Sequence, residues 1–194
     1  MAPPTLVLAS GSRYRREQLA RLGLAVECDA PDIDEARLPG EAAAAMASRL
    51  ARAKAQAVAA RHPESIIIAA DQVAARGEDI LGKPGSASAQ RQQLLDSSGQ
   101  ELRFHSAVAV LDSRKGSLRE HLDLTLCRMR ALTAAQVERY VAVEPAGDCA
   151  GGFKVEGRGI ALFERIDSED PSALIGLPLI ALCRMLRDSG WELP

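Results

Sequence analysis

Apolar runs and helical patterns alternate along the first half of the chain. Short apolar runs predict strands, and stretches whose apolar residues recur every three or four positions predict helices. Thr133 and Gln136 form a capping box, which predicts a helix to about Val143. The last helical pattern, 178–189, is followed directly by Gly190, a common helix-ending residue. Strands are predicted over 5–9, 25–30, 65–73, 102–111, 118–129 and 160–166, and further helices after Ser12 and over 41–61 and 88–95.

The order of these elements predicts an α/β fold with a mixed central sheet and flanking helices. Early strands alternate with helices, which favours parallel pairing, but 102–111 and 118–129 are separated only by a short turn. The chain contains no repeat, low-complexity stretch or clear linker. We therefore expect one domain over residues 1–194, and two lobes around a cleft are compatible with the pattern.

Composition narrows the class of protein. The 194 residues are 47% hydrophobic and 26% charged, with a net charge of −2, as in a soluble globular protein. That charge excludes bulk attraction to nucleic acid or membranes, and no apolar run is long enough to span a membrane. The N-terminus lacks a secretory pattern, and the four scattered cysteines argue against a zinc site. We expect a cytoplasmic protein with reduced thiols.

The first candidate for chemistry is the turn after the strand predicted over 5–9. Residues 10–16 read SGSRYRR, so the next helix opens with two serines and three arginines. Arginine at a helix start opposes the helix dipole. A phosphate chain at that place would be held by the free N–H groups and the guanidinium groups together. The stretch indicates either a phosphate site or an ordinary solvated helix face.

The second candidate is Asp71, which follows the apolar run 66–70. A continuous β-branched run is typical of a central strand buried on both faces, and ligands of α/β sheets bind at the carboxyl ends of such strands. We expect Asp71 at that end, where its carboxylate could bind a divalent metal or activate water. The alternative is an acid that only forms a turn.

Three further charged residues could join such a site. Lys83 lies between a glycine and a proline, in a rigid turn that could present its ammonium group to a phosphate. Lys54 lies close to the apolar stripe of a predicted helix and either reaches into a cleft or extends along the surface. Glu35 follows a predicted strand and is either a metal ligand or a loop charge.

A glycine-rich stretch, residues 148–159, contains Glu156 between tight turns. Its backbone could approach a ligand closely, or it could be a surface loop. The chain has no Gly-x-Ser-x-Gly or Walker motif, which disfavours acyl transfer and P-loop chemistry.

Taken in order, these motifs resemble the Maf family of nucleoside triphosphate pyrophosphatases. The likeness runs from about residue 6 to residue 186. Gln72 and Glu156 are typical of the 7-methyl-GTP branch, whereas the dTTP/UTP branch shows Thr and Gln there. Tyr14 replaces a Trp of some members, and Gly152 a frequent Ser. The matching stretches are LAS at 8–10, Ser12, Arg15-Arg16, Asp34-Glu35, Lys54-Ala55, ADQ at 70–72, ILGKP at 80–84, CAGGFKVEG at 149–157 and DPSALIGLP at 170–178.

The resemblance implies a fold and a reaction. The family fold is α/β, with two lobes about a mixed sheet and a nucleotide cleft between them, similar to inosine triphosphate pyrophosphatase. The reaction cleaves the α–β phosphoanhydride of a nucleoside triphosphate to the monophosphate and pyrophosphate. It implies no nucleic-acid or membrane partner, and a homodimer stays open. Two alternatives also stay open: a dTTP/UTP pyrophosphatase, and a nucleotide-binding division regulator with vestigial hydrolysis.

The resemblance also assigns roles to residues. Asp71 matches the proton acceptor that activates water, and Glu35 with Asp71 would carry Mg²⁺ or Mn²⁺, which suit oxygen-rich phosphate sites. Base choice falls to Tyr14, Gln72 and Glu156. A carboxylate accepts both donors of the guanine edge, and a tyrosine face attracts a cationic methylated base. The triphosphate would be surrounded by Ser10, Ser12, Arg15, Arg16, Lys54 and Lys83.

Overall fold

The computed structural model describes residues 4–193 and confirms an α/β fold with a mixed sheet. The chain divides into two compact units. The first contains the residues up to Asp71, Ser106–Asp123 and the residues from Asp170 onward; the second contains Gln72–His105 and Leu124–Glu169. The strands are β1 (Thr5–Leu8), β2 (Glu27–Cys28), β3 (Ser65–Arg76), β4 (Asp79–Leu81), β5 (Glu101–Asp112), β6 (Ser117–Met129) and β7 (Phe163–Asp167); the helices are α1 (Arg13–Arg21), α2 (Ala43–Ala59), α3 (Ala87–Ser97), α4 (Ala134–Val143) and α5 (Leu179–Asp188), with 3₁₀ turns η1 (Ala150–Gly152), η2 (Arg158–Leu162) and η3 (Ala173–Ile175).

The sheet has the strand order β2-β1-β3-β5-β6-β7, with β4 paired to β3. β1 is parallel to both β2 and β3, in a register that places Leu6 opposite Ile66 and Leu8 opposite Ile68. β4 and β7 pair antiparallel with β3 and β6. β3, β5 and β6 each contribute residues to both units. Parallel and antiparallel pairs thus occur in one sheet, as the mixture of helical and hairpin connections predicts.

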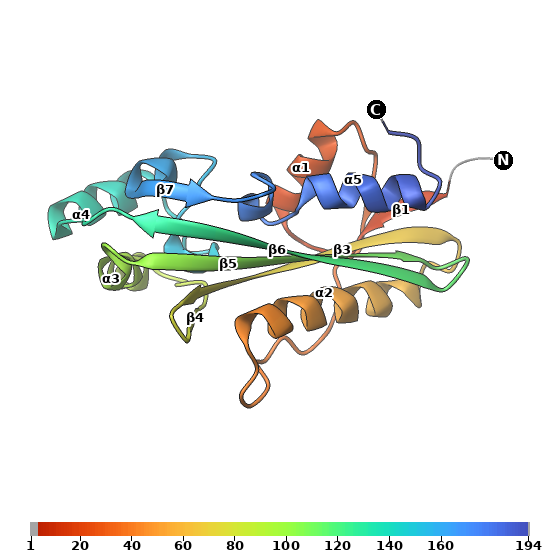
Figure 1. Ribbon diagram of the computed structural model, residues 1–194, viewed down its shortest axis with the longest axis horizontal. Coiled ribbons are helices and arrows are strands. Elements are labelled where there is room, and N and C mark those ends of the chain that lie inside the picture. Colours follow the sequence, from red (N-terminus) through yellow and green to blue (C-terminus); the bar gives the residue numbers. More distant parts are fainter. Residues whose placement is uncertain (1–3, 194) are drawn as a thin grey trace. The chain divides into compact units, whose positions relative to one another are not determined.

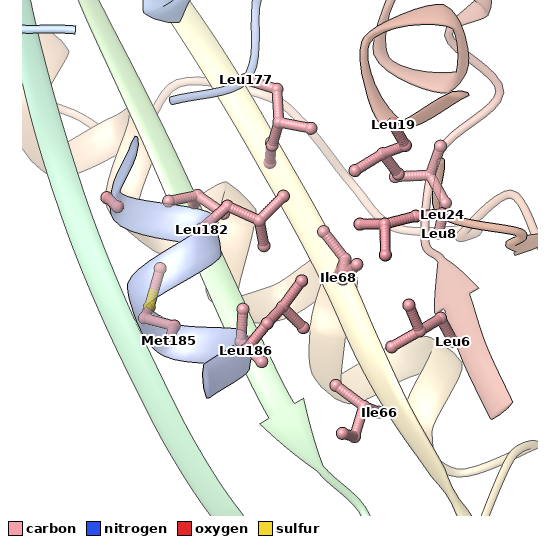
Figure 2. Close-up of a cluster of buried hydrophobic side chains, with 14 residues drawn as sticks. Leu6, Leu8, Leu19, Leu24, Ile66, Ile68, Leu177, Leu182, Met185 and Leu186 are labelled. Atoms are coloured by element: carbon pink, nitrogen blue, oxygen red, sulfur yellow. The ribbon is translucent and has the colours of Figure 1, made fainter. Parts of the chain in front are cut away.

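The core of the first unit lies on one face of β1 and β3. Leu6, Leu8, Ile66 and Ile68 alternate along these strands and meet α1 and α5 in one buried cluster (Figure 2). α5 contributes apolar residues spaced as one helical face. They are Ala181, Leu182, Met185 and Leu186.

The opposite face of the same strands is also buried. Val7 and Ile67 are fully covered, and α2 lies across the strands on the side away from α1 and α5 (Figure 1). Helices on both faces explain the unbroken apolar run in β3. Because side chains alternate along a strand, Asp71 shares the face of Ile67, which is the face that α2 covers.

The second unit is built around aromatic contacts and helix caps. Phe153 packs edge-on against Phe104 and Phe163, with ring centroids 5.5 and 4.7 Å apart. The predicted capping box of Thr133 and Gln136 is confirmed at the start of α4. Buried Gln90 on α3 donates from Nε2 to the carbonyls of Glu144 and Gly152, which ties the glycine-rich stretch to this helix.

Several predicted boundaries are wrong for local reasons. β2 has only the two residues Glu27 and Cys28, whereas a strand was predicted over 25–30. β7 begins at Phe163 because residues 158–162 form a 3₁₀ turn. The short strand β4 was not predicted, and its pairing extends β3 to Arg76. Within residues 4–193, no helix combines the length and apolar character needed to cross a bilayer.

Candidate active site

Asp71 lies in the middle of β3, not at its carboxyl end as predicted. Asp71 is 7% exposed, on the face that α2 covers, and its carboxylate accepts a hydrogen bond from Lys54 Nζ at 2.6 Å. The expectation fails because Ala74, Ala75 and Arg76 pair with β4 and keep the backbone extended beyond the acid. A turn-forming role for Asp71 is thereby excluded, since its backbone is part of a strand.

Lys54 pairs with two carboxylates at once. Its ammonium group lies 2.6 Å from Asp71 Oδ1 and 2.8 Å from Glu35 Oε1, and the residue is 6% exposed. A buried ammonium needs such partners, because an unpaired buried charge is strongly unfavourable. Lys54 therefore joins α2, β3 and the exposed loop residue Glu35.

Arg15 adds a positive charge to this group. Its Nε donates to the Gly176 carbonyl at 2.9 Å, and Nη1 lies 3.4 Å from Ser10 Oγ. Desolvation lowers the pKa of Arg15 from its ordinary value, and the charges of Asp71 and Glu35 oppose this shift. One arginine cation and one lysine cation thus share the field of two carboxylates in the first unit.

The two serines of the first turn act locally. Ser12 is the N-cap of α1, and its hydroxyl accepts from the Arg15 N–H at 3.4 Å. Ser10 is buried, and its hydroxyl accepts from the Ser12 N–H at 3.1 Å. These contacts fix the turn that carries the arginines.

Tyr14 and Arg16 lie toward solvent on α1. Arg16 is exposed, whereas Tyr14 is half-buried. The guanidinium of Arg13 stands 4.7 Å above the Tyr14 ring and donates to its hydroxyl at 2.7 Å. The Tyr14 ring therefore makes a cation–π contact with Arg13. A cation–π contact with a methylated base is what we expected of this ring from the sequence.

The other predicted residues belong to the second unit. Gln72 follows Asp71 on β3 and is half-buried, and Lys83 is exposed after β4. The carbonyl of the preceding Gly82 accepts from Gln93 Nε2 at 3.1 Å, which holds the Lys83 turn to α3. Glu156 is exposed on the glycine-rich stretch.

The support of Glu156 was not predicted from the sequence. Glu144, after α4, accepts the Arg158 N–H at 2.6 Å, and a side chain at Gly157 would meet this carboxylate at 2.5 Å. Tyr140 accepts the Lys154 N–H at 3.1 Å, and burial raises its pKa to about 12, so the hydroxyl stays protonated. The glycines of the stretch were the available signal, because they mark close backbone approach.

Glu35 and Asp71 are the residues expected to carry a divalent metal. Among residues 4–193, no three His, Cys, Asp or Glu side chains gather in a way that could hold a metal ion. Glu35 and Asp71 do offer two carboxylate oxygens as metal ligands, and both oxygens lie beside the Lys54 ammonium group. That set fits Mg²⁺, which uses one or two carboxylates together with substrate phosphates.

Comparison with known proteins gives a family. A family model described as "Maf-like protein" matches residues 5–189. A protein of Xanthomonas axonopodis pv. citri named 7-methyl-GTP pyrophosphatase is 51% identical, covering 98% of this chain and 100% of its own length. One of the same name from Bordetella parapertussis is 53% identical, covering 98% and 94%. A HAM1 protein from Coxiella burnetii matches 66% of this chain and 73% of its own, at a TM-score of 0.45 and 16% identity. With the family model matching nearly the whole chain, this protein belongs to the Maf family.

Proposed function

We propose that this protein is a nucleoside triphosphate pyrophosphatase that hydrolyses 7-methyl-GTP to the monophosphate and pyrophosphate. Relatives about half identical over nearly their full length carry the name 7-methyl-GTP pyrophosphatase. The family match spans both compact units, which supports one functional domain. The observation that carries the proposal is the buried pair of Asp71 and Lys54, with exposed Glu35 on the same ammonium group and Arg15 in its field.

In the proposed reaction, Asp71 accepts a proton from the attacking water. The water oxygen forms a bond to phosphorus, the α–β bridging bond breaks, and pyrophosphate leaves with the electron pair of that bond. Asp71 suits the task because its buried carboxylate is held in one orientation by Lys54. Arg15, with Arg16, Lys83 and the hydroxyls of Ser10 and Ser12, would oppose the charge that collects on the leaving group.

Glu35 and Asp71 would hold the divalent metal, Mg²⁺ or Mn²⁺, which when bound supplies charge neutralisation to the phosphate oxygens. The Lys54 ammonium group, which pairs with both carboxylates, would add a positive charge beside the triphosphate.

Base choice is proposed to rest on Glu156, Gln72 and Tyr14. Glu156 is exposed and therefore free to accept hydrogen bonds from a base, and a carboxylate matches the N1–H and N2–H₂ donors of guanine. Arg13 over the Tyr14 ring would compete with a cationic base for one ring face, so the base would use the other face or displace Arg13.

The test is a substrate panel with product identification. 7-methyl-GTP, GTP, UTP, dTTP and ITP are supplied with Mg²⁺ or Mn²⁺, and the products are resolved by chromatography. The proposal expects the highest kcat/KM for 7-methyl-GTP, with pyrophosphate rather than orthophosphate as the second product. A preference for UTP or dTTP would support the other branch of the family. Binding without turnover of any nucleotide would support a regulator.

A second experiment tests the phosphate contacts. Arg15→Ala and Lys83→Ala should each weaken triphosphate binding by about 10- to 100-fold, because charge-assisted hydrogen bonds are worth about 1.5–3 kcal/mol. Binding of the nucleoside should change less than twofold. Equal losses for nucleoside and triphosphate would show that these side chains serve packing.

A further inference from the structure

Residues 170–178, which we call the α5 cap segment, form a network of local hydrogen bonds before helix α5. Asp170 Oδ1 accepts from the Ser172 N–H at 2.9 Å and from the Ser172 hydroxyl, and Oδ2 accepts from the Ile180 N–H at 2.7 Å. The Ser172 hydroxyl in turn accepts from the Leu179 N–H at 2.8 Å. The two side chains thus cap the first turn of α5 and fix the course of the segment.

Carbonyl groups of the α5 cap segment face helix α1. Gln18 Nε2 donates to the carbonyls of Ser172 and Leu177 at 2.9 and 3.2 Å, and the Gln18 side chain is 2% exposed. Three residues earlier on the same helix face, Arg15 Nε donates to the Gly176 carbonyl at 2.9 Å. The segment is also held from the sheet, because Ser106 on β5 donates to the Ala173 carbonyl at 2.9 Å.

The Gly176 contact determines how the guanidinium can act. The group is planar and carries five N–H donors, so a bond at Nε fixes the plane and leaves the terminal nitrogens to face another acceptor. Nη1 makes only a long hydrogen bond, to Ser10 Oγ at 3.4 Å. Gly176 has a φ of 125°, and a side chain there would meet Arg15 Nε at 3.5 Å.

We propose that the α5 cap segment positions Arg15 for the triphosphate, with Gly176, Gln18 and Asp170 as positioning residues. The proposal rests on the proposed function, because it takes Arg15 as a phosphate ligand. Asp170 and Ser172 fix the backbone of the segment, and the hydrogen bonds of Gln18 hold the segment against α1. The Gly176 carbonyl then orients the guanidinium group of Arg15. The DPSALIGLP sequence is then part of the phosphate site although none of its side chains touches substrate.

Two glycines at the two ends of α5 provide a matched test. Gly176→Ala strains a positive φ beside Arg15, whereas Gly190→Ala strains a φ of 87° after α5 with no atom within 4 Å of the new side chain. We expect Gly176→Ala to raise the KM for 7-methyl-GTP and the inhibition constant of inorganic pyrophosphate about 10-fold or more, with kcat changed less. Gly190→Ala should leave both constants within twofold. We expect both variants to lower the melting temperature, because both strain a positive φ.

Arg15 variants separate the two levels of the proposal. Arg15→Lys keeps the charge but lacks Nε, so adding Gly176→Ala to it should have little further effect on KM. If Arg15→Ala weakens pyrophosphate binding but Gly176→Ala behaves like Gly190→Ala, the positioning role is overturned and the phosphate contact stands. If Arg15→Ala leaves pyrophosphate binding unchanged, the phosphate contact is wrong and the positioning role falls with it.

Gln18→Met repeats the test without a strained backbone. Methionine fills a similar volume but cannot donate to the Ser172 and Leu177 carbonyls. We expect a smaller rise in the KM for 7-methyl-GTP and in the inhibition constant of pyrophosphate, about 5- to 10-fold. It decides the question if Gly176→Ala does not fold, and unchanged constants in a folded Gln18→Met protein would contradict the proposal.

Discussion

The two compact units hold their candidate functional groups in different ways. In the first unit, Asp71 and Lys54 are buried and joined by an ion pair of 2.6 Å. In the second, Lys83 and Glu156 are exposed, and what is fixed is the backbone around them, through Gly82 and Arg158. The groups proposed for the reaction are preorganised by burial and pairing, whereas Lys83 and Glu156, proposed to contact the phosphates and the base, are presented to solvent on supported turns.

This contrast predicts separable effects of mutation. Changes at buried Asp71 or Lys54 should lower the turnover of every nucleotide by the same factor, or lower the stability of the fold. A change at Glu156 should alter the ranking of nucleotides, a change at Lys83 should weaken the binding of every triphosphate, and neither should affect the fold.

The largest expected effect comes from Asp71→Asn. The amide keeps the shape but cannot accept a proton, so kcat should fall about 10²- to 10⁴-fold. Calorimetry should still detect nucleotide binding, because the proposed phosphate ligands remain. Turnover close to that of the unmodified protein would remove Asp71 from the reaction.

Lys54→Met should be next, and its effect is on stability. It leaves the buried Asp71 without its 2.6 Å partner, so we expect a loss of about 3 kcal/mol in the free energy of unfolding. Urea titration measures this loss. Glu35→Gln is the matched control: Glu35 is exposed, and its loss should cost less than about 1 kcal/mol. Equal losses for both variants would contradict the unequal burial of the two pairs.

Glu156→Gln should change specificity rather than stability. The amide brings a donor opposite the N1–H or N2–H₂ of guanine, and one misplaced base contact costs about 1–3 kcal/mol. The ratio of kcat/KM for 7-methyl-GTP over UTP should fall by roughly 5- to 150-fold. The melting temperature should stay constant, and an unchanged ratio would remove Glu156 from base choice.

Tyr140→Phe should give the smallest effect. It removes the acceptor of the Lys154 N–H at 3.1 Å, which should cost about 1 kcal/mol of stability and loosen the turn that carries Glu156. The specificity ratio should fall by less than it does in Glu156→Gln. A larger fall would mean that Tyr140, not Glu156, dominates base choice.

Much of the fold could be predicted from local patterns. The capping box at Thr133 and the unbroken apolar run in β3 each follow from short-range chemistry, and the structure confirms both. β4 and the full length of β3 could not be predicted, because their pairing depends on residues separated by a turn. The 3₁₀ turn over 158–162 likewise replaces the start of a predicted strand.

The candidate site likewise contains residues that could be predicted from local patterns and contacts that could not. Residue types and order singled out Asp71 and Lys54 as charges next to an apolar pattern, and Arg15 as one of three arginines at a helix start. Their partners could not be predicted: Arg15 and Gly176 are separated by 161 positions, and Gln18 and Leu177 by 159. Such contacts follow from tertiary packing, which carries no local sequence signal.

The most direct test of the account is the ratio of kcat/KM for 7-methyl-GTP over UTP, measured in the unmodified protein, Asp71→Asn and Glu156→Gln. The account predicts a ratio above one in the unmodified protein, the same ratio at much lower absolute rates in Asp71→Asn, and a reduced ratio at nearly normal stability in Glu156→Gln. A ratio below one in the unmodified protein, or a ratio that changes with Asp71 and not with Glu156, would contradict it.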